Sequence, residues 1–323
     1  MRLADEHYIQ QGQQKLRCGY ILSVAGPQES TGDQIFSGQQ LICENGEILA
    51  QVKGPSYGLE GPEKVMGNIK DLIHQLPNVQ EASGIGVCVP GPVDKKTQTM
   101  TLSTNLKGFK GYPMAKELSE EFHLPTYLDN DANCAGLAEA LVGAGKGLHT
   151  VFYVTISTGI GGVLVVDGKT VSGMHGFGGE IANMIIDRDR EKVNYLNAGA
   201  VENEASGTAI TRKGKQALPE EDIQHAGNVF DLAEKGNEKA KAIVSQMEED
   251  LGQMFATIST VCDPEMFVIG GGMTKSADKF LPGVIENFKK FSHDAVHDTP
   301  FKIAELDEPG IIGAAMIPLS EGE

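Results

Sequence analysis

Short apolar runs that end in glycine or polar residues, each followed by a helical pattern, recur along this chain and constrain its fold more than any other feature. "GVCV" is followed by Pro90-Gly91-Pro92, "TYL" by residues 129–131, and "MFVI" by Gly270 to Gly272. Runs of this length suit buried strands, and helical spacing follows them. Strands that alternate with helices predict an α/β fold. In such sheets ligands bind beyond the carboxyl ends of the strands, so the residues that end these runs are site candidates.

The acidic balance of the chain argues against several kinds of partner. Its 323 residues carry a formal net charge of -17, and the sequence pI is about 4.9. Such a surface repels phosphate backbones, so we expect no nucleic-acid partner. No apolar stretch approaches the roughly 18 residues that span a bilayer, and residues 1–17 lack the apolar segment of a signal peptide. The five scattered cysteines form no CxxC pair and suit a reducing compartment. We therefore expect a cytoplasmic protein without a membrane partner.

The hairpin "TISTGIGGVLVV" contains Gly159, Gly161 and Gly162 between two β-branched runs. Glycine lets a backbone turn with positive φ and lets N–H groups converge on an anion without a Cβ in the way. Ser157 and Thr158 add hydroxyl donors. The pattern fits a phosphate-binding turn and a plain tight hairpin about equally well, and it is not a Walker loop. The glycine run of "FVIGGGM" leaves a similar choice open, between a ligand contact and a strand-to-helix turn that needs small residues.

The stretch "YLDNDANCAGLAEALVG" concentrates polar side chains where a strand passes into a helix. One such side chain is enough to cap the helix, and capping is the alternative to a functional role. We expect Asn133 and the backbone to begin the helix, which leaves Asp131 and Asn130 to face a ligand. A carboxylate at a helix N-terminus stays ionised and can accept a proton from a hydroxyl. An amide can bridge two hydroxyls as donor and acceptor, so the pair indicates polyol binding.

The order of these motifs closely resembles that of the ROK family, which comprises bacterial sugar kinases and their repressor relatives. The resemblance runs from about Gly84 to Ala315 and includes "NDAN", "TGIGG", "GFGGEIANM", "VIGGGM" and "EPGIIGAA". It implies a two-lobed, actin/hexokinase-like (ribonuclease H-like) α/β ATPase fold. It also implies ATP with Mg²⁺ as cofactor, a small-molecule sugar as partner, and a homodimer.

The resemblance also implies roles for individual residues. Asp131 matches the family's catalytic base toward the attacking sugar hydroxyl. The positions that hold the sugar correspond to Asn105, Asn130, Glu180 and Glu202. The positions that contact the nucleotide correspond to Thr158, Gly159, Gly161, Gly270, Gly271 and Gly272, and Ser157 belongs to the same turn.

Two departures from the family pattern affect the site. Family members usually carry a histidine and a CxCGxxGC run that bind zinc, but the four ligand positions here read Asn183, Val193, Tyr195 and Ala200. We therefore expect no structural zinc, a loop 187–203 held by packing and hydrogen bonds, and Asn183 in place of the histidine's contact with the sugar.

The second departure is the first phosphate loop, Asp-x-Gly-Gly-Thr-Lys, which is missing. Val24 or Ala25 stands where its aspartate belongs, and "ESTGD" (Glu29 to Asp33) offers hydroxyls at a displaced position. This loss should weaken the handling of Mg²⁺ and the γ-phosphate. Some 18 residues precede the first strand, too few for a winged helix, so a DNA-binding repressor is not expected.

Two hypotheses of function follow. The first is ATP-dependent phosphorylation of a hexose or amino sugar by a glucokinase-like ROK enzyme, with Asp131 as general base. The alternative is a sugar-binding ROK protein with weak or lost kinase activity. For the domains, we expect a smaller N-terminal α/β lobe over residues 1–118, completed by a C-terminal helix over 308–323, and a larger C-terminal α/β lobe over 119–307.

Overall fold

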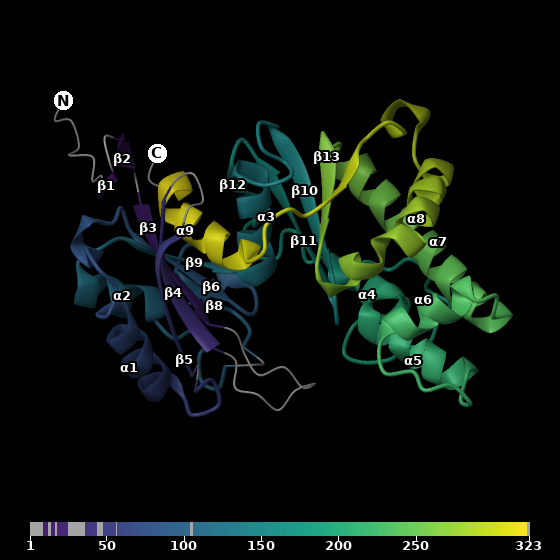
Figure 1. Cartoon of the computed structure of the whole chain (residues 1–323), viewed down its shortest axis with the longest axis horizontal. Coiled ribbons are helices and arrows are strands. Elements are labelled where there is room, and N and C mark those ends of the chain that lie inside the picture. The colour runs from purple at the N-terminus through teal and green to yellow at the C-terminus, as the bar shows by residue number, and fades with distance from the viewer. Residues whose placement is uncertain are drawn as a thin grey trace. The chain divides into compact units, whose positions relative to one another are not determined.

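The computed structural model describes residues 9–11, 14–16, 18–24, 36–43, 48–55, 57–103 and 106–321 (Figure 1). Contacts divide the chain into two compact units. The first contains the described residues up to Gly147, together with Val165–Gly178 and the residues from Glu305 onward. The second contains Leu148–Leu164 and Gly179–Ala304. The first unit therefore extends well past residue 118, where the sequence patterns placed its boundary.

The sheet of the first unit explains this correction. Its strand order is β5-β4-β3-β6-β9. The strands β3 (Cys18–Val24), β4 (Phe36–Cys43) and β5 (Ile48–Pro55) are antiparallel neighbours, and β6 (Ile85–Val89) and β9 (Thr126–Asn130) extend the sheet in parallel. All five residues of β9 pair with β6. Because of this pairing, the polar residues that end β9 belong to the first unit.

Four longer helices flank this sheet. They are α1 (Pro62–Ile73), α2 (Met114–Phe122), α3 (Asp131–Leu141) and α9 (Pro309–Glu321). Alternate residues of β6 point to opposite faces of the sheet. On one face, Ile85, Val87 and Val89 share a core with α1 and α2, which includes Val65, Ile69, Leu118 and Phe122. Helices α3 and α9 pack against each other on the other face (Figure 1).

Glycines allow α9 to approach β6 and α3 closely. A Cβ on Gly86 would lie 1.7 Å from the carbonyl oxygen of Ala314, and a Cβ on Gly313 would lie 1.6 Å from that of Cys134. Neither contact tolerates a side chain, so these glycines fix the C-terminal helix in the first unit. Smaller elements complete the unit: the hairpins β1 (Ile9–Gln11) with β2 (Gln14–Leu16) and β7 (Val93–Asp94) with β8 (Thr99–Met100), and η1 (Val79–Glu81).

The second sheet has the strand order β12-β11-β10-β13-β14. β10 (Thr150–Ile156), β13 (Met266–Gly270) and β14 (Phe301–Ile303) are parallel. β11 (Ile160–Val166) follows the glycine turn, and its last residues, which belong to the first unit, pair with β12 (Lys169–Thr170). The carboxyl ends of β10 and β13 therefore lie side by side, at the two glycine motifs.

Helices form most of the rest of the second unit. They are α4 (Val201–Ala205), α5 (Gly207–Ala217), α6 (Ala226–Glu234), α7 (Glu238–Cys262) and α8 (Ala277–Phe291), with the short η2 (Ile181–Asn183), η3 (Gly272–Ser276) and η4 (Asp294–Val296). The ring of Phe267 on β13 contacts Phe255 of α7 and Phe288 of α8, so these two helices pack on the sheet through aromatic side chains. Among the described residues, no helix is both long and apolar enough to cross a membrane.

Candidate functional site

The join between β9 and α3 carries the first group of predicted residues. Asn130 is the N-cap of α3: its Oδ1 accepts hydrogen bonds from the amides of Ala132 at 2.8 Å and Asn133 at 3.4 Å. The prediction that Asn133 begins the helix is therefore wrong. The oxygen of Asn130 is used by the cap, and its amide nitrogen, which donates to the carboxylate of Asp131, has a second hydrogen that can reach a ligand.

Asp129 has a structural task. It is 1% exposed, and its Oδ2 accepts from Lys95 Nζ at 2.6 Å and from Thr170 Oγ1 at 3.1 Å. Its Oδ1 accepts from Asn133 Nδ2 at 2.7 Å and from the amide of Asn130 at 2.8 Å. The carboxylate thus joins β9, α3, β12 and the turn after β7. Sequence reasoning missed Lys95, because no local pattern links it to a strand 34 residues away.

Asp131, in contrast, is exposed in the first turn of α3. Desolvation by the surrounding protein raises its pKa, and hydrogen bonds from the amides of Ala132 and Asp131 and from the side chain of Asn130 counter the rise. Because the side chain keeps an exposed surface, these hydrogen bonds and the helix N-terminus limit the rise of the pKa. We infer an ionised carboxylate near neutral pH that can accept a proton.

The two glycine motifs come together in the second unit. Thr155 of β10 is the register partner of Gly270 on β13. Gly271 has a φ of 88°, and a Cβ there would lie 2.4 Å from the carbonyl oxygen of Ile156. A Cβ on Gly270 would lie 2.1 Å from the hydroxyl of Tyr153. Close packing at two adjacent strand ends therefore demands these glycines, and it brings residues 157–161 beside residues 270–272.

The turn between β10 and β11 uses its glycines for close approach. None of Gly159, Gly161 and Gly162 has a positive φ, so the expectation that they turn the backbone in that way is wrong. A Cβ on Gly159 would lie 2.5 Å from Oε2 of Glu202, and that same oxygen accepts from the amide of Ile160 at 2.9 Å. The sequence thus placed Gly159 and Glu202 in one site, and the structure puts them in contact.

Part of the polar backbone of this turn is occupied within the protein. The amide of Ser157 donates to the carbonyl of Gly159 at 2.8 Å, and the carbonyl of Ser157 accepts from the amide of Gly207 at 2.8 Å. The amide of Thr208 reaches the carbonyl of Thr158 at 3.4 Å. These bonds fix the turn on the N-terminus of α5, while the side chain of Thr158 remains exposed.

The predicted sugar-binding acids approach this turn from two directions. Burial raises the pKa of Glu202, and its hydrogen bond from Ile160 counters the rise. Glu180 is exposed and follows Gly179, where φ is 90° and a Cβ would lie 2.3 Å from the carbonyl oxygen of Gly162. This close approach holds the segment of Glu180 against β11.

Asn183 lies on the exposed side of η2, and its Oδ1 accepts from the amide of Asn197 at 2.8 Å. Its oxygen therefore supports the loop that follows. Tyr195 and Val193, at two of the expected zinc positions, are 83% and 44% exposed. Asn105 lies outside the described residues, as do Ala25 and the "ESTGD" segment.

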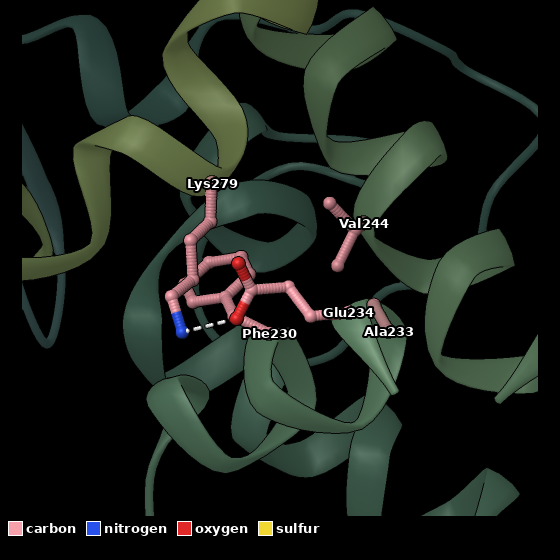
Figure 2. A pocket seen from close by; sticks show the side chains of 5 residues that line it. All are labelled: Phe230, Ala233, Glu234, Val244 and Lys279. Carbon is pink, nitrogen blue, oxygen red and sulfur yellow. Dashed lines mark ion pairs between the residues drawn. The ribbon is translucent and has the colours of Figure 1, made fainter. Parts of the chain in front are cut away.

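A small cavity of about 220 Å³ lies elsewhere in the second unit, between α6, α7 and α8 (Figure 2). Its walls are Phe230, Ala233 and Val244, and Lys279 pairs with Glu234 at 2.7 Å beside them. It contains none of the residues that the sequence singled out. The candidate site is therefore built at strand ends and helix starts.

The arrangement of strands and helices defines the class of protein. The chain has a two-lobed actin/hexokinase-like fold, in which each lobe is α/β. A ROK hexokinase from Thermus thermophilus has a similar structure, with a TM-score of 0.81 and 26% sequence identity over 95% of this chain and 98% of that one.

Within this class, the chain belongs to the ROK family, whose sequence model matches residues 38–321. It is 30% identical to a glucokinase of Halalkalibacterium halodurans over 84% of this chain and 88% of that protein. It is also 26% identical to a xylose repressor of Caldicellulosiruptor bescii, over 85% of this chain and 73% of the repressor. The family resemblance seen in the sequence is confirmed.

Proposed function

We propose that this protein is an ATP-dependent sugar kinase that phosphorylates a hexose or amino sugar. The single observation that carries the proposal is the contrast between Asp129 and Asp131. Asp129 is buried with a partner on each oxygen, whereas Asp131 presents an exposed carboxylate at a helix N-terminus. An acid kept available in this way suits a general base, and similarity to glucokinases supplies the substrate class.

In this proposal, Asp131 accepts the proton of a sugar hydroxyl while the hydroxyl oxygen attacks the γ-phosphorus of ATP. The bond from that phosphorus to the bridging oxygen breaks, and ADP leaves. The groups that would hold the sugar ring are Asn105, Asn130, Glu180, Asn183 and Glu202. The turn with Ser157, Thr158, Gly159 and Gly161 would contact the phosphates, and the glycines 270–272 would lie near the nucleoside.

Mg²⁺ would accompany the nucleotide and neutralise its phosphate charge. This ion binds mainly through phosphate oxygens and water, with one or two protein oxygens. The described residues contain no group of three or more His, Cys, Asp or Glu placed to hold a metal, and such a cage is not needed here. The exposed hydroxyl of Thr158, in the turn that would contact the phosphates, is an oxygen ligand of the right kind.

The test is ATP consumption, measured by ADP release, against a panel of hexoses, amino sugars and pentoses. We expect turnover with at least one hexose or amino sugar. Asp131→Asn should lower kcat by about 10²–10⁴-fold, the usual contribution of a positioned base, without loss of the folded state. Turnover that survives this substitution would remove Asp131 from its role.

A second candidate function, sugar binding without phosphoryl transfer, is favoured by one observation. Val24, which ends β3, or Ala25 stands where the family resemblance places the aspartate of the first phosphate loop. Calorimetry separates the two functions. A protein that only binds sugar should show heat of binding with sugar and none with Mg-ATP, whereas a kinase should bind both.

A further inference from the structure

The loop between η2 and α4 carries a guanidinium, that of Arg190, which joins the loop to two other segments. Arg190 binds both oxygens of Asp250 on α7: Nη1 donates to Oδ2 at 2.6 Å, and Nη2 donates to Oδ1 at 2.7 Å. Nη1 also donates to Oε2 of Glu204 on α4 at 3.0 Å, and Nε reaches Oδ2 of Asp187 at 3.3 Å. Asp250 and Glu204 are only 2% and 5% exposed. A two-pronged Arg–carboxylate pair with buried acids is strong and directional.

Helix α4 is held from its other side by α5. Lys213 Nζ donates to both Oε2 and the carbonyl oxygen of Glu204 at 2.8 Å. Arg212 Nη2 donates to the carbonyl oxygen of Asn203 at 2.6 Å. A helix of five residues is too short to be stable by itself, so these external bonds determine where it lies.

Glu202 is placed by the same short helix. It lies two residues before Glu204, and its Oε2 reaches the amide of Ile160 at 2.9 Å in the glycine turn. A shift of α4 would therefore move the carboxylate of Glu202 away from that turn. Without Arg190, the two buried carboxylates that share its Nη1 would be left with like charges and fewer partners, which favours such a shift.

We propose that Arg190 positions Glu202 for sugar binding, by fixing the loop 184–200 and α4 through this ion-pair network. Arg190 is a positioning residue and does not itself contact the substrate. The network fixes a loop in which positions 183, 193, 195 and 200 carry neither histidine nor cysteine. The inference rests on the proposed function, because the sugar contact of Glu202 is part of it.

Calorimetric titration with the sugar that the wild type binds best is the first test. Arg190→Gln should weaken sugar binding about tenfold, equivalent to ~1.4 kcal/mol, and should leave Mg-ATP affinity nearly unchanged. Arg190→Lys should restore part of the loss, since it keeps the charge but not the two-pronged geometry. Arg188→Gln is the matched control: Arg188 is exposed on the same loop and makes no ion pair within the described part of the chain.

A double-mutant cycle separates positioning from a general loss of stability. If Arg190 acts through Glu202, the Arg190→Gln/Glu202→Gln double variant should bind sugar no more weakly than Glu202→Gln alone. The proposal would be overturned if the losses of sugar-binding free energy in the two single variants were additive in the double variant. Wild-type sugar affinity in Arg190→Gln would overturn it too.

Cleavage by a lysine-specific protease at the exposed Lys192 reports on the loop without any sugar. Arg190→Gln should be cut there several-fold faster than wild type and than Arg188→Gln, because the ion pairs that order the loop are gone. Equal rates would show that Arg190 does not order the loop. If the wild type binds no sugar but the cleavage rates differ, the proposed function fails, and Arg190 keeps only its role in ordering the loop.

Discussion

At the scale of single residues, two acids separated by one position have opposite environments. Asp129 is the last residue but one of β9, and its side chain is buried and needs Lys95, Thr170 and Asn133 as partners. Asp131 begins the next helix, where the chain has turned and the side chain meets solvent. The change from strand to helix therefore gives Asp129 a structural role and leaves the carboxylate of Asp131 available as the proposed general base.

This contrast predicts opposite effects of the same substitution. Asp129→Asn should lower the free energy of unfolding by about 3 kcal/mol, because it removes the charge that balances a partly buried lysine. Asp131→Asn should leave stability nearly unchanged while it removes turnover. Urea unfolding of both variants, followed by circular dichroism, measures the difference. Equal stability of the two would contradict the structural role of Asp129.

The pH dependence of turnover should show the titration of Asp131. Desolvation raises the pKa of this group above the ordinary value of 3.8. A general base must be deprotonated, so kcat should fall as the pH drops through the raised pKa and should level off above it. Turnover measured from pH 4 to pH 8 tests this sign. A rate that increases toward acid would mean that Asp131 does not act as the base.

At the scale of elements, the two parallel strands β10 and β13 bring the glycine motifs together. The structural need for glycine differs between neighbouring positions of the second motif. Gly271 combines a φ of 88° with close contact to the carbonyl of Ile156. Gly272 has room for a side chain, since the nearest atom to a Cβ there would be the hydroxyl oxygen of Ser157 at 3.4 Å. The strand end therefore requires a glycine at one position and merely accepts it at the next.

Substitution with alanine should distinguish these neighbours. Gly271→Ala should destabilise the protein by about 1–3 kcal/mol, from backbone strain and the clash with Ile156. Gly272→Ala is the matched control and should cost much less. Thermal melts of both variants give the comparison. A stable Gly271→Ala variant would show that β10 and β13 can separate at this point.

At the scale of the whole molecule, one buried acid marks two places where the chain passes between the units. Glu139 on α3 is 0% exposed and accepts from the amides of Ala144 at 2.9 Å, Glu305 at 3.2 Å and Leu306 at 2.9 Å. The chain changes units just after Gly147 and just before Glu305. Glu139 therefore ties the helix that begins with Asp131 to both connecting segments.

Replacing this acid tests how much the connection matters. Glu139→Gln turns one acceptor oxygen into a donor that faces backbone amides, and should cost about 1–3 kcal/mol of stability. Glu265→Gln is the control, because the exposed Glu265 likewise accepts from two amides, those of His149 and Thr150. There, water can replace the lost bond. Denaturant titration of both variants measures the loss of unfolding free energy. Equal losses would show that burial of Glu139 is unimportant.

Local sequence was sufficient for the class of the fold. Short apolar runs identified β6, β9 and β13 as strands, and all five residues of β6 and of β13 are buried. The motif order identified the family, and Gly159 with Glu202 proved to lie in one place. These features depend on neighbouring residues in the chain, or on motifs that a family keeps in order, and both can be read from a sequence.

Pairings between distant segments were decided only by the tertiary structure. The sequence gives no local sign that Lys95 neutralises Asp129, or that Arg190 meets Asp250 at a separation of 60 residues. The sequence reasoning also chose Asn133 instead of Asn130 to begin α3, because both are good capping residues and only the backbone geometry selects one. The end of the first unit moved from 118 to 147 for the same reason: parallel pairing of β9 with β6 is a long-range contact, and no repeat within either strand specifies its partner.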